Sequence, residues 1–345
     1  MYEQIKQITE RYINEGYFPS AVVSVFDAKG TIERCAFGKN PDGTAVNTDT
    51  VYDVASLSKI ANSTQALLAM DAGQLKLETL VCDVLPEIKA RPNLYNRLHH
   101  VTIYQLLTHS SGILDWYPFY VQRGKDFYDV FDSFIGDTEI MEGTVYSDMN
   151  LMLVGKVLEK IKGKPLAACL NDFREFLGAN RLEYNPENTE NMAPSSYGNG
   201  IEEEMCAERN LTFDGWRSKE VPTLGAVNDG NAHYFFDGIA GHAGVFADVD
   251  AYERIGRLYL TTDSPLMLRS MTEQEDGRGL GWQISESLFP EGCGHTGFTG
   301  TSIWVSRKNG VGAIAFTNRL CFPDHNGTGT NAFREEIHRM VLKNL

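Results

Sequence analysis

The sequence lacks the features that would indicate a nucleic-acid, membrane or metal partner. Lys and Arg total 31 against 46 Asp and Glu, the net charge is −15, and the basic residues are scattered rather than gathered in a stripe. No apolar run approaches the roughly 18 residues that a membrane-spanning helix needs. Neither an H-E-x-x-H motif nor a cluster of Cys and His is present. We therefore expect no nucleic acid, no membrane, no metal and no cofactor.

A secretory leader and a disulfide framework are also missing. The first residues, Met1–Lys6, have neither the basic nor the apolar segment of a signal peptide, so we expect a cytoplasmic protein whose chain starts with a short amphipathic helix. In that compartment cysteines are free and structural. The six cysteines form no C-x-x-C pair: Cys35, Cys82, Cys169, Cys206, Cys293 and Cys321. Cys293 is two residues before His295, which makes it the one thiol to examine near a site.

The periodicity of apolar residues changes along the 345 residues. Strand-like runs occur near both ends, and helical spacing fills the middle. The expected strands are Ala21–Phe26, Thr31–Phe37, Gly244–Ala247, Thr301–Ser306 and Val311–Thr317. Asn309-Gly310 predicts a hairpin turn between the last two. Expected helices include 60–72, ended by Gly73, and 331–345.

This order of elements predicts an α/β protein of the α+β type. One antiparallel sheet is built from both ends of the chain and flanked by helices, and an all-helical lobe is inserted. We expect a single domain, residues 1–345. Its sheet lobe spans about 1–55 and 235–345, and its helical lobe about 75–230. No feature of the sequence indicates an oligomeric state.

The sequence Ser56-Leu57-Ser58-Lys59 is an S-x-x-K motif at a predicted strand-to-helix junction. Residues three apart on a helix share a face, with Cβ atoms about 5–6 Å apart. A serine hydroxyl becomes a nucleophile when a neighbour takes its proton, and a lysine at that offset can do so if its pKa is lowered. The backbone N–H of a serine in a first helical turn can also face a developing oxyanion.

Two further motifs follow in order, Tyr146-Ser147-Asp148 and His295-Thr296-Gly297. A second Tyr-x-Asn-like site, Tyr197-Gly198-Asn199, lies in a Gly- and Asn-rich loop. Tyr146 is favoured over Tyr197 because it precedes a helix-like apolar run. S-x-x-K, then Tyr-x-Asn-like, then Lys/His-Thr-Gly is the order found in penicillin-recognising serine enzymes.

With these motifs, the chain from the 20s to the C-terminus resembles class C β-lactamases, their D,D-peptidase relatives, and the esterases and amidases of the same fold. Further stretches that carry the resemblance are Leu106–Ile113, Tyr146–Asn150, Val154-Gly155, Gly279–Trp282 and Gly294–Ser302. The resemblance implies a site between the sheet and the helical lobe. It also implies the β-lactamase/transpeptidase-like fold.

The resemblance implies a role for each matching residue. Ser56 would be the acylated nucleophile, and Lys59 and Tyr146 would share the duties of base and acid. The backbone N–H groups of Ser56 and Phe298 would form the oxyanion hole. For Lys59 to accept a proton near neutral pH, its pKa must fall.

Two residues depart from the pattern of many β-lactamases. His295 replaces a lysine, which weakens the positive charge that would hold a substrate carboxylate, because histidine is largely neutral near pH 7. Asp148 replaces an asparagine and would either repel an anionic substrate or pair with Lys59 and hold it charged. Asp148, His295, Thr296 and Gly297 are therefore the candidate substrate-binding residues, and both changes argue against an efficient β-lactamase.

Other polar residues have plainer interpretations. His109, in a Thr-His-Ser-Ser-Gly turn, is expected to be a structural loop histidine, and His233 and His242 lie in a glycine-rich stretch without metal-ligand spacing. Turn chemistry explains Asn228–Asn231, although this segment could line the cleft. Trp116–Tyr120 is expected either to face substrate or to pack within the helical lobe.

The sequence thus predicts a serine hydrolase that cleaves an ester or amide bond of a small-molecule or peptide-like substrate through an acyl-enzyme on Ser56. Within this class, a carboxylesterase, a D-amino-acid peptidase, a muropeptide amidase and a weak β-lactamase stay open. The alternative outside the class is a catalytically weak penicillin-binding-like sensor or scaffold, which Asp148 motivates.

Overall fold

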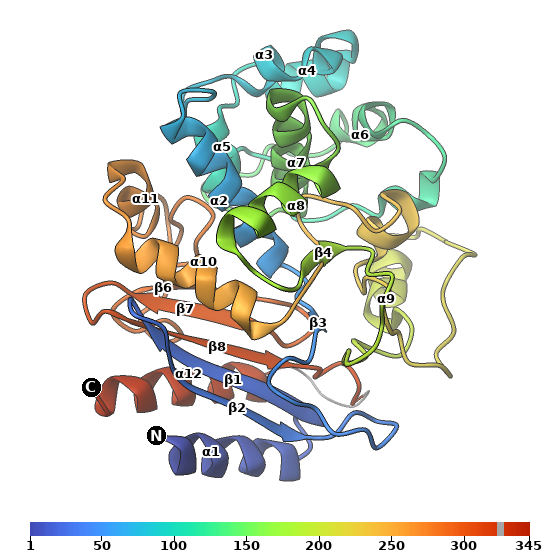
Figure 1. Cartoon of the computed structure of the whole chain (residues 1–345). Coiled ribbons are helices and arrows are strands. Elements are labelled where there is room, and N and C mark those ends of the chain that lie inside the picture. The colour runs from blue at the N-terminus through green and yellow to red at the C-terminus, as the bar shows by residue number, and fades with distance from the viewer. Residues whose placement is uncertain (323–327) are drawn as a thin grey trace.

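The computed structural model describes residues 1–322 and 328–345. Its largest sheet is five-stranded and antiparallel, in the order β2-β1-β8-β7-β6 (Figure 1). The strands are β1 (Ser20–Asp27), β2 (Thr31–Gly38), β6 (Cys293–Thr296), β7 (Ser302–Ser306) and β8 (Val311–Thr317). Strands from the two ends of the chain are paired directly, for example Val23 with Ala315, so the sheet is assembled from both ends as the sequence predicts.

Helices cover both faces of this sheet, which explains why β1 and β8 are apolar on both sides. The terminal helices α1 (Tyr2–Asn14) and α12 (Thr328–Lys343) lie together on one face, and α10 (Val249–Thr261) lies on the other (Figure 1). In α1 the side chains of Ile5, Ile8 and Tyr12 are buried against the sheet, as their spacing predicts.

The helical region lies beyond α10 and surrounds α2 (Leu57–Asp71), which starts at the S-x-x-K motif (Figure 1). Gly73 has φ +73°, a left-handed conformation that ends this helix. The other helical elements are α3 (Val81–Val84), η1 (Pro86–Ala90), α4 (Pro92–Leu98), α5 (Ile103–Leu107), η2 (Phe119–Gln122), α6 (Phe127–Ile135), α7 (Asp148–Lys162), α8 (Leu166–Leu177), α9 (Gly200–Glu208), η3 (Asn231–Phe235) and α11 (Pro265–Ser270).

A second, three-stranded sheet in the order β3-β5-β4 was not expected. It contains β3 (Tyr52–Asp53), β4 (Leu182–Tyr184) and β5 (Val245–Ala247). The sequence predicts a strand at 244–247, but in the structure it pairs with β3 and β4 rather than joining the large sheet. β3 ends at the strand-to-helix junction that the sequence predicts before Ser56, whereas β4, with three residues, is too short to show a period of two and was missed.

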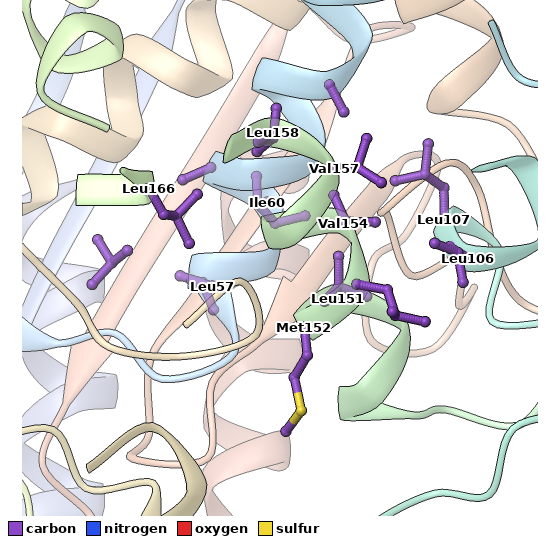
Figure 2. Close-up of a cluster of buried hydrophobic side chains, with 14 of the residues drawn as sticks. Leu57, Ile60, Leu106, Leu107, Leu151, Met152, Val154, Val157, Leu158 and Leu166 are labelled. Carbon is purple, nitrogen blue, oxygen red and sulfur yellow. The ribbon is translucent and has the colours of Figure 1, made fainter. Parts of the chain in front are cut away.

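The core beneath the site joins α2 to α7. Figure 2 shows Leu57 and Ile60 of α2 beside Leu151, Val154 and other apolar side chains of α7, all of them buried. Each fully buried side chain of this size stabilises the fold by about 1.5–3 kcal/mol. This packing fixes the S-x-x-K helix relative to the helix that starts at Asp148.

Two findings bear on the remaining expectations. All six cysteines are free and buried, as predicted. Among the described helices, none has the length and apolar character to cross a bilayer. The residue limits of the sheet and helical lobes stay a prediction.

Candidate active site

Ser56 lies at a constrained turn between β3 and α2. Ala55, just before it, has φ 49°, an uncommon conformation for a residue with a side chain. Asp53 Oδ1 accepts a hydrogen bond from the Ala55 backbone N–H at 2.9 Å, and Thr301 Oγ1 donates to the Val54 carbonyl at 2.9 Å. The turn that presents Ser56 is thus held by the carboxylate of Asp53, within the turn, and by Thr301, in the loop after β6.

Lys59 reaches the Ser56 hydroxyl directly. Its Nζ lies 2.8 Å from Ser56 Oγ and 3.2 Å from the carbonyl oxygen of His242. The lysine side chain is only 1% exposed. The helical offset of three residues therefore brings the two groups together as the sequence predicts.

Tyr146 precedes α7 and Asp148 begins it, and both lie around the same ammonium group. Asp148 Oδ1 is 2.8 Å from Lys59 Nζ, and the centroid of the Tyr146 ring is 4.9 Å from it. Of the two consequences expected of Asp148, the structure shows the second, an ion pair with Lys59.

The structure does not show the lowered pKa that Lys59 would need in order to accept a proton near neutral pH. Burial lowers the pKa of Lys59, but the charge of Asp148, followed by Tyr146, outweighs burial and leaves it above the ordinary value of 10.5. Lys59 is therefore an ammonium ion at neutral pH, and its bond to Ser56 Oγ is one that it donates.

His109 positions the segment that carries Tyr146. Its Nδ1 accepts a hydrogen bond from the Ser147 backbone N–H at 3.1 Å, and its ring centroid is 4.8 Å from that of Tyr146. Burial, with the nearby charges of Arg278 and Lys59, holds the pKa of His109 well below its usual range, so it is a neutral acceptor. The loop histidine is structural, as expected, and its contacts lie directly beside the candidate site.

The third motif lies along the same cleft, a cavity of about 540 Å³. His295 is buried, and its Nδ1 lies 2.8 Å from the Thr296 carbonyl oxygen. Burial, followed by the charges of Lys59 and Arg278, lowers the pKa of His295 to about 3, so it is neutral near pH 7 as the sequence predicts.

A Cβ on Gly297 would lie 2.0 Å from Thr301 Oγ1 and 2.5 Å from the Val54 carbonyl oxygen, so the strand end fits only without a side chain. The cleft is lined by Ser56, Tyr146, Arg278, Gln283, His295, Thr296, Gly297, Phe298, Arg319, Asn331 and Arg334.

Three arginines in this cleft were not predicted. None of them forms an ion pair with a carboxylate of the described residues. Arg334 is buried and donates to the carbonyl oxygens of Gly297 and Thr301, at 3.1 and 2.8 Å. Arg319 donates to the Phe298 carbonyl at 2.6 Å. The guanidinium of Arg278 lies 4.9 Å from the Tyr146 ring centroid. The positive charge that His295 does not supply is therefore provided by arginines.

Asp229 and His242 lie in loops, as the sequence predicts, and these loops reach the Lys59 side chain. His242 Nε2 is 3.0 Å from Asp229 Oδ1. One ligand atom each from Asp148, Asp229 and His242 lie within 4.8 Å of one another, a spacing that a metal ion could use. A divalent cation there would have to displace the Lys59 ammonium from Asp148. The cluster is instead explained by two ion-pair contacts, Asp148 with Lys59 and Asp229 with His242.

The other candidates lie outside the cleft or are inert. Tyr197 lines a neighbouring cavity, whereas Tyr146 lies beside Lys59. Cys293 is fully buried, and burial raises the pKa of its thiol far above the usual range. Phe298 borders the cleft with Ser56, and the oxyanion role of their backbone N–H groups stays a prediction.

Comparisons with known proteins show the family and the fold of this chain. A family model described as Beta-lactamase matches residues 5–334. The chain is 27% identical to an N-acetylmuramyl-L-alanine amidase of Bacillus subtilis (strain 168) over 366 residues, which covers 93% of this chain and 81% of that protein. It is 25% identical to a putative D-alanyl-D-alanine carboxypeptidase of Escherichia coli (strain K12), covering 92% and 82%. A class C β-lactamase structure from Rhodobacter sphaeroides superposes with a TM-score of 0.71 at 19% identity, covering 98% and 99%, which confirms the predicted fold.

Proposed function

Because the chain belongs to the β-lactamase family of serine hydrolases, we propose that Ser56 is its nucleophile and forms an acyl-enzyme with an ester or amide substrate. The observation that carries this proposal is the 2.8 Å contact between Ser56 Oγ and Lys59 Nζ at the wall of the cleft. A nucleophile within hydrogen-bond reach of a base, with the base held by a third group, is the arrangement that such catalysis requires.

In the proposed reaction, Ser56 Oγ attacks the substrate carbonyl carbon, and its proton passes to the pair formed by Lys59 and Tyr146. Lys59 is charged at rest, so the Lys59–Tyr146 pair must first lose one proton to solvent, and the site vacated on the pair then accepts the proton of Ser56. The same proton then goes to the leaving oxygen or nitrogen as the carbonyl re-forms. Water, deprotonated by the same pair, hydrolyses the ester on Ser56.

The arginines support a substrate that carries a carboxylate. Arg278 is the best placed to bind it, because its side chain lines the cleft and has no anionic or hydrogen-bond partner among the described residues. The similar proteins are an amidase and a putative carboxypeptidase, and both names refer to peptide-like compounds. We therefore favour an amidase or peptidase acting on a carboxylate-bearing peptide, with muropeptides and D-amino-acid peptides as the first classes to test.

A fluorophosphonate probe tests the nucleophile. Intact-protein mass spectrometry should show one adduct, and peptide mapping should place it on Ser56. Ser56→Ala should abolish both labelling and turnover of a chromogenic ester, while the exposed Ser218→Ala should retain both. Labelling of Ser56→Ala at the wild-type rate would refute the assignment.

One observation favours a second function, a sensor that acylates slowly and turns over poorly. The ion pair with Asp148 holds Lys59 protonated in the resting protein. A β-lactam that stabilises the protein against heat and stays covalently bound for many minutes would support the sensor. Rapid nitrocefin turnover would instead support a weak β-lactamase.

A cytoplasmic location is also a proposal, to be tested by cell fractionation.

A further inference from the structure

A second cavity of about 450 Å³ adjoins the catalytic cleft. Phe298 lines both cavities and so stands between them. Arg319 fixes this partition, because its Nε donates to the Phe298 carbonyl and its guanidinium lies 4.9 Å from the Phe298 ring centroid. The lining residues of the second cavity, here called the side pocket, are Ser196, Tyr197, Gly198, Asn199, Gly200, Ile201, Glu202, Lys219, Asn228, Phe298, Leu320 and Phe322.

The polar groups of the side pocket are held by one another. Asn228 Nδ2 donates to Ser196 Oγ at 2.7 Å, and Asn199 Nδ2 donates to the Asn228 carbonyl at 2.7 Å. Asn199 Oδ1 in turn accepts from the Tyr234 hydroxyl at 2.8 Å. These bonds preorganise the pocket before any ligand arrives, and a preorganised site spends less free energy on ordering its side chains.

The side pocket carries almost no net charge at neutral pH, unlike the arginine-lined cleft. Burial, followed by the charge of Asp229, raises the pKa of Glu202 to about 8, so its carboxyl group is largely protonated. Lys219 is paired with Glu203, with 2.7 Å between Nζ and Oε2. Neither residue therefore offers a free charge to a ligand.

The apolar surface of the side pocket is accessible from solvent. Ile201 and Phe298 are each 44% exposed, and both line the side pocket. Leu320 and Phe322 lie on the segment that follows Asn318-Arg319, so the same short stretch supplies an arginine to the cleft and apolar groups to the side pocket.

We infer that the side pocket is a substrate subsite, which binds an uncharged, partly apolar group on one side of the scissile bond while the carboxylate of the same substrate lies among the arginines. The inference rests on the proposed function, since it needs a scissile bond at Ser56. It predicts a substrate with two unlike ends, one anionic and one neutral with apolar surface, on the two sides of Phe298.

Two pairs of esters test the subsite. In the first pair, 3-carboxyphenyl acetate and 3-carboxyphenyl phenylacetate, the carboxylate is on the alcohol and the acyl group grows. In the second pair, the methyl and benzyl monoesters of succinic acid, the carboxylate is on the acyl side and the alcohol grows. The wild type should prefer the larger member of at least one pair in kcat/KM, and that pair also shows which side of the scissile bond enters the pocket.

The variant Ile201→Glu places a charge in the side pocket at an exposed position. It should lower kcat/KM about tenfold or more for the preferred larger ester, with less than about a twofold change for its small partner. Ile32→Glu, on β2 and 45% exposed, is the matched control and should change neither.

Equal effects of Ile201→Glu on large and small esters, or no preference for either larger ester in the wild type, would overturn the subsite. Labelling by the fluorophosphonate keeps this failure separate from failure of the proposed function. A Ser56 adduct that forms normally in Ile201→Glu, without any size preference, rejects the side pocket alone. Absence of a Ser56 adduct in the wild type rejects the nucleophile.

Discussion

Two cations contact the ring of Tyr146, and their surroundings differ. Lys59 Nζ and the Arg278 guanidinium carbon each lie 4.9 Å from the ring centroid. Lys59 is 1% exposed and paired with Asp148, whereas Arg278 has no carboxylate partner among the described residues and lines the open cleft. One cation is compensated by the protein, and the other is free to be compensated by a ligand.

This difference separates proton transfer from substrate binding. A buried ammonium without a partner would be costly, so Asp148 stabilises the charged form of Lys59 and holds it in contact with Ser56. An arginine is always charged and presents a planar set of donors, so Arg278 can await a carboxylate without a protein partner. Under the proposed function, Lys59 holds a proton beside Tyr146 and Arg278 is the group near the same ring that binds the substrate anion.

The largest effect is expected from removing the compensated cation. Lys59→Gln should lower kcat by about 10²–10⁴-fold, because a positioned acid–base group contributes that much. Lys308→Gln, at a site 73% exposed, is the matched control and should leave kcat unchanged. Steady-state rates with a chromogenic ester measure the change, and a thermal melt shows whether the variant is folded. A folded Lys59→Gln protein with the wild-type kcat would contradict the role of Lys59.

Removing the uncompensated cation should mainly affect binding. Arg278→Gln should raise KM about 10–100-fold for a carboxylate-bearing ester, since a hydrogen bond to a charged group contributes roughly 1.5–3 kcal/mol. The methyl ester of the same compound, which lacks the anion, should be hydrolysed with unchanged KM. Arg339→Gln, an exposed position on α12, serves as the control. An equal rise of KM for both compounds would argue that Arg278 supports Tyr146 rather than the substrate.

A subtler effect is expected from uncoupling Lys59 from Asp148 without removing the lysine. Because the charge of Asp148 raises the pKa of Lys59, Asp148→Asn should lower it, and the amine should lose its proton at lower pH. The acidic limb of the kcat/KM profile should then move to lower pH. Asp214→Asn, at a side chain 92% exposed, should leave the profile in place. An acidic limb that stays fixed or moves to higher pH in Asp148→Asn would count against Lys59 as the titrating base.

The same comparison shows which parts of the site a sequence can reveal. Ser56 and Lys59 come from one motif, and Tyr146 and Asp148 from another, so short contiguous patterns were enough to find them. Arg278, Arg319 and Arg334 occur singly, without a local pattern. They meet only because the loop before β6, the segment after β8 and helix α12 converge at the cleft, and this convergence is a property of the tertiary structure.

The fold shows a similar limit. In the large sheet, β1, β7 and β8 were predictable because burial on both faces requires continuous apolar runs, whereas β6 has no such run and was not among the strands expected from periodicity. The direction of the Lys59 pKa shift was not predictable, because two opposing effects decide it. Burial lowers it and a carboxylate 2.8 Å away raises it, and only the structure gives that distance.

The smallest effect on catalysis is expected at His338, which lies on α12 on the other face of the sheet. Burial lowers the pKa of His338 to about 4, against about 6.5 in an unfolded chain. The unfolded state therefore binds a proton that the folded state does not, and stability contributed by the neutral ring is lost as pH falls below about 6.5.

His338→Gln should remove this part of the acid sensitivity and leave kcat near the wild-type value. Between pH 7 and pH 5 the free energy of unfolding should fall by about 2 kcal/mol less in the variant than in the wild type, as the two pKa values imply. Urea unfolding at both pH values measures the difference, and the exposed His100→Gln is the control. An equal loss in both proteins would mean that folding does not lower the pKa of His338, despite its stacking on Trp304.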